Sequence, residues 1–113
     1  MKMSDRKKPH YVYLIGNKKL NYYKIGLALD ITSRLKDFCL PFPIVLLSKV
    51  TLPDRNKALE VEQGIHRLYR GLRVRGEWFR NIDIYQFVFD AEYIAAGRYD
   101  LAEAEYSKRK GKK

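Results

Sequence analysis

The chain has 113 residues, of which 46% are hydrophobic and 13% aromatic, and its formal net charge is +10. This length suits one compact domain with one site, and the apolar content excludes a wholly disordered chain. The single cysteine, Cys39, excludes an intrachain disulfide and a cysteine-rich zinc cluster, and we expect it to be a small core residue. No apolar run is long enough for a membrane span or a signal core, so we expect a protein of the cytoplasm or of a nucleus, with no membrane partner.

The positive charge is concentrated at the two ends of the chain. Residues 1–10 carry a net charge of +3 and residues 106–113 carry +5, which leaves the middle nearly balanced. We therefore divide the chain into a basic N-terminal tail (1–10), a folded domain (11–97) and a basic C-terminal tail (98–113). Such tails bind phosphates without sequence preference, or they serve only solubility.

The first half of the folded domain predicts a β-hairpin, a short helix and a third strand. Residues 10–16 and 22–28 are rich in β-branched and aromatic residues, and a turn-like segment separates them. Alternation places Tyr13 and Lys24 on one face of this hairpin. Asp30 is expected to cap the short helix, and the apolar run 44–51 predicts a buried strand.

The second half predicts two amphipathic helices. Asp54 is expected to cap the first, whose apolar stripe faces the core while Glu62 and His66 run along its edge. An arginine-rich turn leads into the short aromatic segment 76–79, and apolar residues at 84–95 fit the last helix. The expected fold class is α/β (α+β), with a small, mainly antiparallel three-stranded sheet flanked by helices.

A series of short motifs occurs in an order that resembles a nuclease superfamily. The motifs are Tyr11-Val12-Tyr13, Tyr23-Lys24-Ile25-Gly26, Arg34-Leu35, Val61-Glu62 and Gly76-Glu77-Trp78-Phe79. From residue 11 to 79 the chain resembles the GIY-YIG nuclease superfamily, in a branch common in phages and bacteria whose second motif reads KIG and in which GEWF follows. The resemblance implies a GIY-YIG-like fold and an endonuclease that hydrolyses DNA phosphodiester bonds with Mg²⁺ or Mn²⁺. It also implies the cytoplasm of a bacterium or of a phage-infected cell.

The resemblance gives each candidate catalytic residue a role. Glu62 would hold the metal, Arg34 would bind the scissile phosphate, and Tyr13 would activate water. Because tyrosine has an ordinary pKa near 10, Lys24 and Arg34 would have to lower the pKa of Tyr13. Lys24 stands where the superfamily has its second tyrosine, and it would orient the phosphate or act as the base itself. His66 would relay a proton or touch the metal, or else be structural.

The remaining candidates concern substrate binding. Gly26 would let the backbone and the substrate approach closely. Four arginines are expected to bind the DNA backbone, namely Arg67, Arg70, Arg73 and Arg75. Glu77 is not expected to be a metal ligand, and Trp78 and Phe79 are expected to close the core rather than stack on bases.

Two other functions stay open at this point. The sequence has Tyr11 in place of the first glycine of GIY and Lys24 in place of the second tyrosine. These departures also suit a GIY-YIG-like fold that binds DNA but has lost turnover. A basic adaptor for another protein is a third hypothesis. The presence of Tyr13, Arg34 and Glu62 together favours the enzyme, because a pure binder needs no carboxylate facing a phosphate. A double-strand cut with one active site would need two passes or a homodimer.

Overall fold

A computed structural model describes residues 3–38 and 40–111 of the chain, and Cys39 lies outside these residues. Its strands are β1 (His10–Asn17), β2 (Tyr22–Ala28), β3 (Val45–Leu52), β4 (Arg73–Arg75) and β5 (Trp78–Phe79). Its helices are α1 (Met3–Arg6), α2 (Ile31–Lys36), α3 (Arg55–Leu68), α4 (Ile84–Ala95) and α5 (Tyr99–Gly111), with the short 3-10 helix η1 (Arg70–Leu72). None of these described helices is long and apolar enough to cross a membrane.

The structure is a small α+β fold built on one antiparallel sheet in the order β3-β1-β2-β5-β4. Over residues 3–38 and 40–111 the sheet has five strands, so the expectation of three was wrong. The arginine-rich segment expected as a turn contains β4, and the aromatic segment after it contains β5. Strands of two and three residues are too short to show an alternating pattern, which is why the sequence did not predict them.

The hairpin of β1 and β2 places the candidate residues in register. Tyr13 pairs with Gly26 and Ile15 pairs with Lys24, so these four residues share one sheet face. That face packs against α2, whose Ile31 joins Tyr13 and Ile15 in a small buried cluster. The predicted hairpin and its facial pattern are confirmed.

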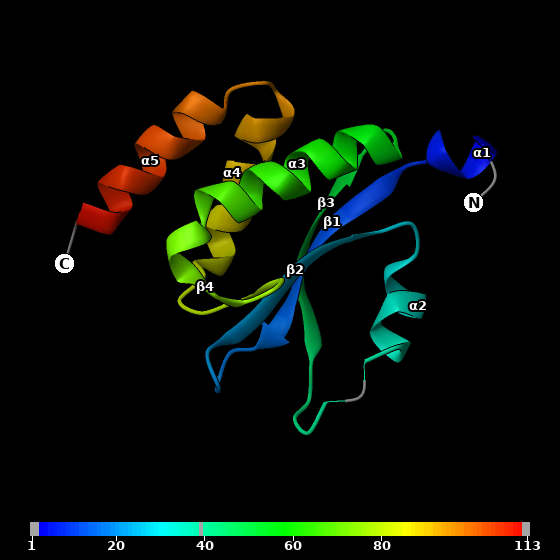
Figure 1. The fold of residues 1–113 in the computed structure, drawn as a ribbon, viewed down its shortest axis with the longest axis horizontal. Helices are drawn as coiled ribbons and strands as arrows, with labels where there is room; N and C mark the ends of the chain where they lie inside the picture. Colours follow the sequence, from blue (N-terminus) through cyan, green and yellow to red (C-terminus); the bar gives the residue numbers. More distant parts are fainter. Residues whose placement is uncertain (1–2, 39, 112–113) are drawn as a thin grey trace.

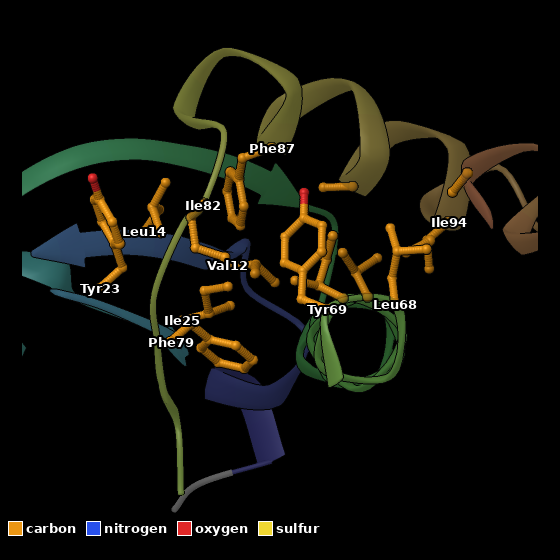
Figure 2. Packing of buried hydrophobic residues seen from close by; sticks show 14 of the residues in the cluster. Val12, Leu14, Tyr23, Ile25, Leu68, Tyr69, Phe79, Ile82, Phe87 and Ile94 are labelled. Atoms are coloured by element: carbon orange, nitrogen blue, oxygen red, sulfur yellow. The ribbon is translucent and has the colours of Figure 1, made fainter. Parts of the chain in front are cut away.

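The larger core lies on the opposite face of the sheet, under α3 and α4. Figure 1 shows α3, α4 and α5 together on one side of the sheet and α2 on the other. Val12 and Ile25 from the sheet face Phe87 of α4 in this core (Figure 2). Ile65 of α3 belongs to the same cluster, and all four side chains are fully buried. The predicted caps Asp30 and Asp54 accept backbone N–H bonds at the starts of α2 and α3, as expected.

Strand β3 lies at an edge of the sheet and not in its interior. It pairs only with β1, and Val45 and Leu46 are exposed. The expectation of a buried strand was therefore wrong. An apolar run indicates a strand, but it does not tell whether that strand has neighbours on both sides.

Helix α5 extends the folded unit beyond residue 97, into the segment expected as a basic tail. Asp90 of α4 is fully buried, and its carboxylate accepts a hydrogen bond from the Tyr69 hydroxyl. The same carboxylate forms an ion pair with Arg109 of α5, whose Nη2 lies 2.8 Å away. Ala102 of α5 is fully buried in the same core. These contacts anchor α5 to α3 and α4.

Candidate functional site

A pocket opens beside the part of β2 that β5 does not cover. Strand β5 pairs with β2 only at Tyr23 and Lys24, which leaves the following residues of β2 without a neighbour from β5. The pocket has a volume of about 540 Å³. The polar residues that line it are His10, Tyr13, Lys24, Arg34, Arg55, Glu62 and Glu77. The structure thus brings together Tyr13, Lys24, Arg34 and Glu62, which four separate segments of the chain supply.

Tyr13 lies under the sheet face at Gly26. Its side chain is 2% exposed, and a Cβ atom at Gly26 would come within 2.6 Å of the Tyr13 ring carbon Cζ. No real side chain tolerates such a contact. Gly26 was expected to make room for the substrate, but in the structure it makes room for the phenol of Tyr13.

Burial controls the acidity of Tyr13. Desolvation raises the pKa of Tyr13 above its ordinary value of 10, and this outweighs the opposite effects of Lys24 and Arg34. Lys24 and Arg34 do lower this pKa, but not by enough to bring it below its ordinary value, as a role of Tyr13 as the base would require. The reason is that α2 shields the phenol from water, which disfavours the charged tyrosinate more than two neighbouring cations favour it. Tyr13 therefore keeps its proton at neutral pH.

Lys24 is held by Glu77, a residue that was not expected to be a metal ligand and was given no other role from the sequence. Its ammonium forms an ion pair with Glu77, and the Lys24 side chain is only 14% exposed. Glu77 directly precedes β5, and its carbonyl accepts a hydrogen bond from the backbone N–H of Ile25 at 3.2 Å. The pairing of β5 with β2 therefore brings Glu77 beside Lys24. The sequence did not predict this pairing, so it gave no indication that Glu77 reaches the pocket.

Glu62 lies in the pocket near a second carboxylate. Burial, and after it the negative charge of Glu77, raise the pKa of Glu62 from its ordinary 4.5 to about 7, against smaller effects of Lys24, Arg55 and Arg34. Arg55 also escaped the sequence analysis. It stands seven residues before Glu62, which is about two helical turns, and this spacing places both on one side of α3.

His66 contacts the sheet and does not line the pocket. Its Nε2 lies 2.8 Å from the carbonyl oxygen of Ile25, which can only accept, so this nitrogen carries the proton and donates it. Nδ1 then faces Arg73 Nη2 at 3.4 Å, and burial lowers the pKa of the ring. The ring also packs edge-to-face on Phe79, with 5.1 Å between the centroids. Of the alternatives for His66, this geometry supports the structural one.

The four arginines expected to bind DNA lie outside the pocket. Arg67 stacks on the ring of Tyr99 with its guanidinium carbon 4.8 Å from the centroid, and Arg73 contacts His66. Arg70 donates to the carbonyl of Arg67 at 2.8 Å, and Arg75 is exposed at the end of β4. Arg34 and Arg55 are the guanidinium groups that face the pocket.

The carboxylates of the pocket suit one kind of metal ion better than others. The described residues contain no group of three or more His, Cys, Asp or Glu side chains that could hold a metal. Glu62 and Glu77 form a pair whose mutual repulsion a cation would relieve. Mg²⁺ takes one or two carboxylates and completes its shell with water and phosphate oxygens, so these residues fit it. They do not fit a structural zinc site, which needs four protein ligands.

One protein-family model matches the part of the chain that contains the pocket. The model described as the T5orf172 domain matches residues 10–94. The chain belongs to the T5orf172 domain family. The matched region of this T5orf172 domain contains every polar residue of the pocket, whereas α5 lies beyond it. Comparison with curated proteins and with solved structures gave no match.

The family match corrects the resemblance drawn from the motifs. The T5orf172 domain is a different family from the GIY-YIG superfamily, so membership in the latter was wrong. Tyr11 and Lys24 are the two positions at which the sequence departs from the motifs of that superfamily. The candidate residues must therefore be judged by the chemistry of this pocket alone.

Proposed function

We propose that this T5orf172 domain is a metal-dependent endonuclease that hydrolyses phosphodiester bonds in DNA. The observation that carries the proposal is the convergence of a buried phenol, three cations and two carboxylates in one open pocket. Phosphodiester hydrolysis requires this combination, because charge on the phosphoryl oxygens must be compensated while a proton reaches the leaving oxygen.

The cations of the pocket suit a bound phosphate. Among the described residues, neither Arg34 nor Arg55 forms an ion pair, whereas Lys24 is held by Glu77. Arg34 comes from α2 and Arg55 from α3, so the two guanidinium groups approach the pocket from elements on opposite faces of the sheet. Planar guanidinium forks bind phosphate oxygens in pairs, so two of them would hold and orient one phosphodiester group.

The remaining residues supply positioning and proton transfer. Glu62, with Glu77 beside it, would hold Mg²⁺ or Mn²⁺, and such an ion when bound compensates phosphoryl charge and makes its water acidic. Tyr13 keeps its proton, so we propose that its hydroxyl donates to the phosphate or to the leaving oxygen. Lys24 adds positive charge at the same place, and Glu77 fixes the position of its ammonium.

The net charge of +10 and the arginines outside the pocket favour a long polyanion over a small phosphate ester as the substrate. One pocket per chain would cut one strand at a time, so a double-strand cut would use a homodimer or two binding events.

Incubation with supercoiled plasmid tests the proposal. We expect open-circular plasmid in the presence of Mg²⁺ or Mn²⁺ and unchanged plasmid in the presence of a chelator. A gel-shift assay on the same plasmid measures binding separately. Binding without any cleavage in either metal would contradict the proposal and favour a DNA-binding module instead.

A further inference from the structure

An aromatic cluster lies on the same sheet face as Lys24, beyond the pocket. The rings of Tyr22 and Trp78 stack with 4.8 Å between their centroids and 9° between their planes. The guanidinium carbon of Arg80 lies 5.9 Å from the Tyr22 centroid, and Phe42 meets Tyr22 edge-on at 5.8 Å. The three rings are half-buried and Arg80 is exposed, so the cluster keeps a surface toward solvent.

The cluster is not part of the main core. Strand β5 alternates, so Phe79 points into the core and is fully buried, while Trp78 points to the opposite face. The expectation that both residues close the core is confirmed for Phe79 only. Trp78 instead stacks on Tyr22, which is two residues from Lys24 along β2.

The cluster begins where the pocket ends. Trp78 pairs directly with Lys24 in the register of β5 and β2, and Glu77, the residue before Trp78, holds the Lys24 ammonium. Two residues along a strand span about 7 Å, and successive phosphates of a stacked strand rise by about 3.4 Å. The aromatic surface therefore lies within about two nucleotides of a phosphate bound at Lys24.

A pair of asparagines fixes both ends of the cluster. Asn21, next to Tyr22, and Asn81, next to Arg80, both adopt left-handed backbone conformations, with φ of 54° and 60°. Asn21 Nδ2 donates to Asn81 Oδ1 at 2.8 Å, and the Asn81 backbone N–H donates to Asn21 Oδ1 at 2.9 Å. This reciprocal contact holds the turn after β1 against the end of β5. The cluster is thus preorganised, which lowers the entropic cost of placing a ligand on it.

We propose that Trp78, Tyr22 and Arg80 form a stacking platform for an unpaired nucleobase whose neighbouring phosphate lies in the pocket. This inference rests on the proposed function. An indole face offers stacking to any base, and the exposed guanidinium of Arg80 adds a cation for the base or for the next phosphate. The pocket recognises the phosphate, which every nucleotide shares, whereas the platform recognises a base that is not stacked in a duplex. The protein therefore prefers single-stranded or locally opened DNA.

Trp78 is the only tryptophan of the chain, so its fluorescence reports directly on the platform. The full chain is titrated in chelator with single-stranded oligothymidylate of about 12 nucleotides, a length typical of single-strand binding sites. A parallel titration uses an abasic deoxyribose-phosphate polymer of the same length and charge. We expect oligothymidylate to quench Trp78 and the abasic polymer to leave it unchanged, with about tenfold weaker binding of the latter by anisotropy.

Variants separate stacking from a purely structural role of the cluster. Trp78→Leu is expected to bind both polymers equally weakly, and Arg80→Gln, which leaves the stacked rings in place, is expected to lose part of the preference for oligothymidylate. Tyr85→Leu serves as the control, because Tyr85 is 80% exposed on α4. Tyr85→Leu should keep the full preference. Circular dichroism checks that each variant is folded.

The outcomes distinguish this inference from the proposed function. Equal affinity for the two polymers with no change in Trp78 fluorescence overturns the platform, even if plasmid is still cut. If neither polymer binds and plasmid is not cut, the proposed function fails and the platform fails with it.

Discussion

Replacing Glu62 with glutamine is expected to stabilise the fold at alkaline pH and to leave its stability nearly unchanged in acid. The pKa of Glu62 is about 7 in the folded protein against an ordinary 4.5, so the folded state holds the proton more tightly than the unfolded chain does. The stability due to this proton is fully present below about pH 4.5 and is lost as the pH rises through about 7. Above that range the wild type folds around a desolvated carboxylate, which glutamine replaces with a neutral amide of the same size.

The structure sets the size of this effect. The difference between a pKa of about 7 and 4.5 corresponds to about 3 kcal/mol. Glu62 is only half-buried, and screening by solvent reduces the expected gain to about 1–2 kcal/mol. For a domain of this size the gain raises the melting temperature by about 5–10 °C.

Urea denaturation followed by circular dichroism at about pH 4 and about pH 9 measures the difference. Glu60→Gln is the matched control, since Glu60 is exposed on the same helix and pairs with Lys57 at 2.8 Å. The control is expected to change the free energy of unfolding by less than about 1 kcal/mol at either pH. A Glu62→Gln protein no more stable than the wild type at about pH 9 would refute the reasoning on burial and repulsion.

Substitutions at Gly26, Tyr13 and Arg109 test the contacts of these three residues. Gly26→Ala should displace the phenol of Tyr13 and slow plasmid cleavage at least tenfold while DNA affinity in a gel shift stays the same; an unchanged rate would show that the phenol position does not matter. Tyr13→Phe should slow cleavage at every pH tested, because the phenol acts in its protonated form; recovery of the variant at high pH would contradict this. Arg109→Met should cost about 3–5 kcal/mol in urea denaturation, because it leaves the buried Asp90 without its cation; a loss below about 1 kcal/mol would show that α5 is not anchored there.

The sequence predicted the parts of the fold that have a clear periodicity. The hairpin of β1 and β2 alternates over seven or eight residues in each strand, and Asp30 and Asp54 mark the starts of α2 and α3. Strands β4 and β5 are defined by their pairing and not by any repeat of their own. Helix α5 carries an apolar stripe through Tyr99, Ala102 and Tyr106, but its charges led the segment to be interpreted as a tail.

The sequence predicted those site residues whose positions follow from the periodicity of a single strand or helix. Parity along β1 and β2 placed Tyr13 and Lys24 on one face, and the structure keeps them together in the pocket with Glu62. Glu77 reaches Lys24 only through the pairing of β5 with β2, which the sequence did not indicate. The direction of the Tyr13 pKa was missed because it depends on burial under α2, a property of the packed structure.

Cleavage of supercoiled plasmid by Glu62→Gln and Glu60→Gln, compared in Mg²⁺, is the sharpest test of whether this pocket is a metal-dependent nuclease site. The two glutamates lie two residues apart on α3, but only Glu62 lines the pocket. We expect Glu62→Gln to be folded, to bind the plasmid in a gel shift and not to cut it, while Glu60→Gln cuts at the rate of the wild type. Cutting by Glu62→Gln at that same rate would contradict a role of Glu62 in the reaction.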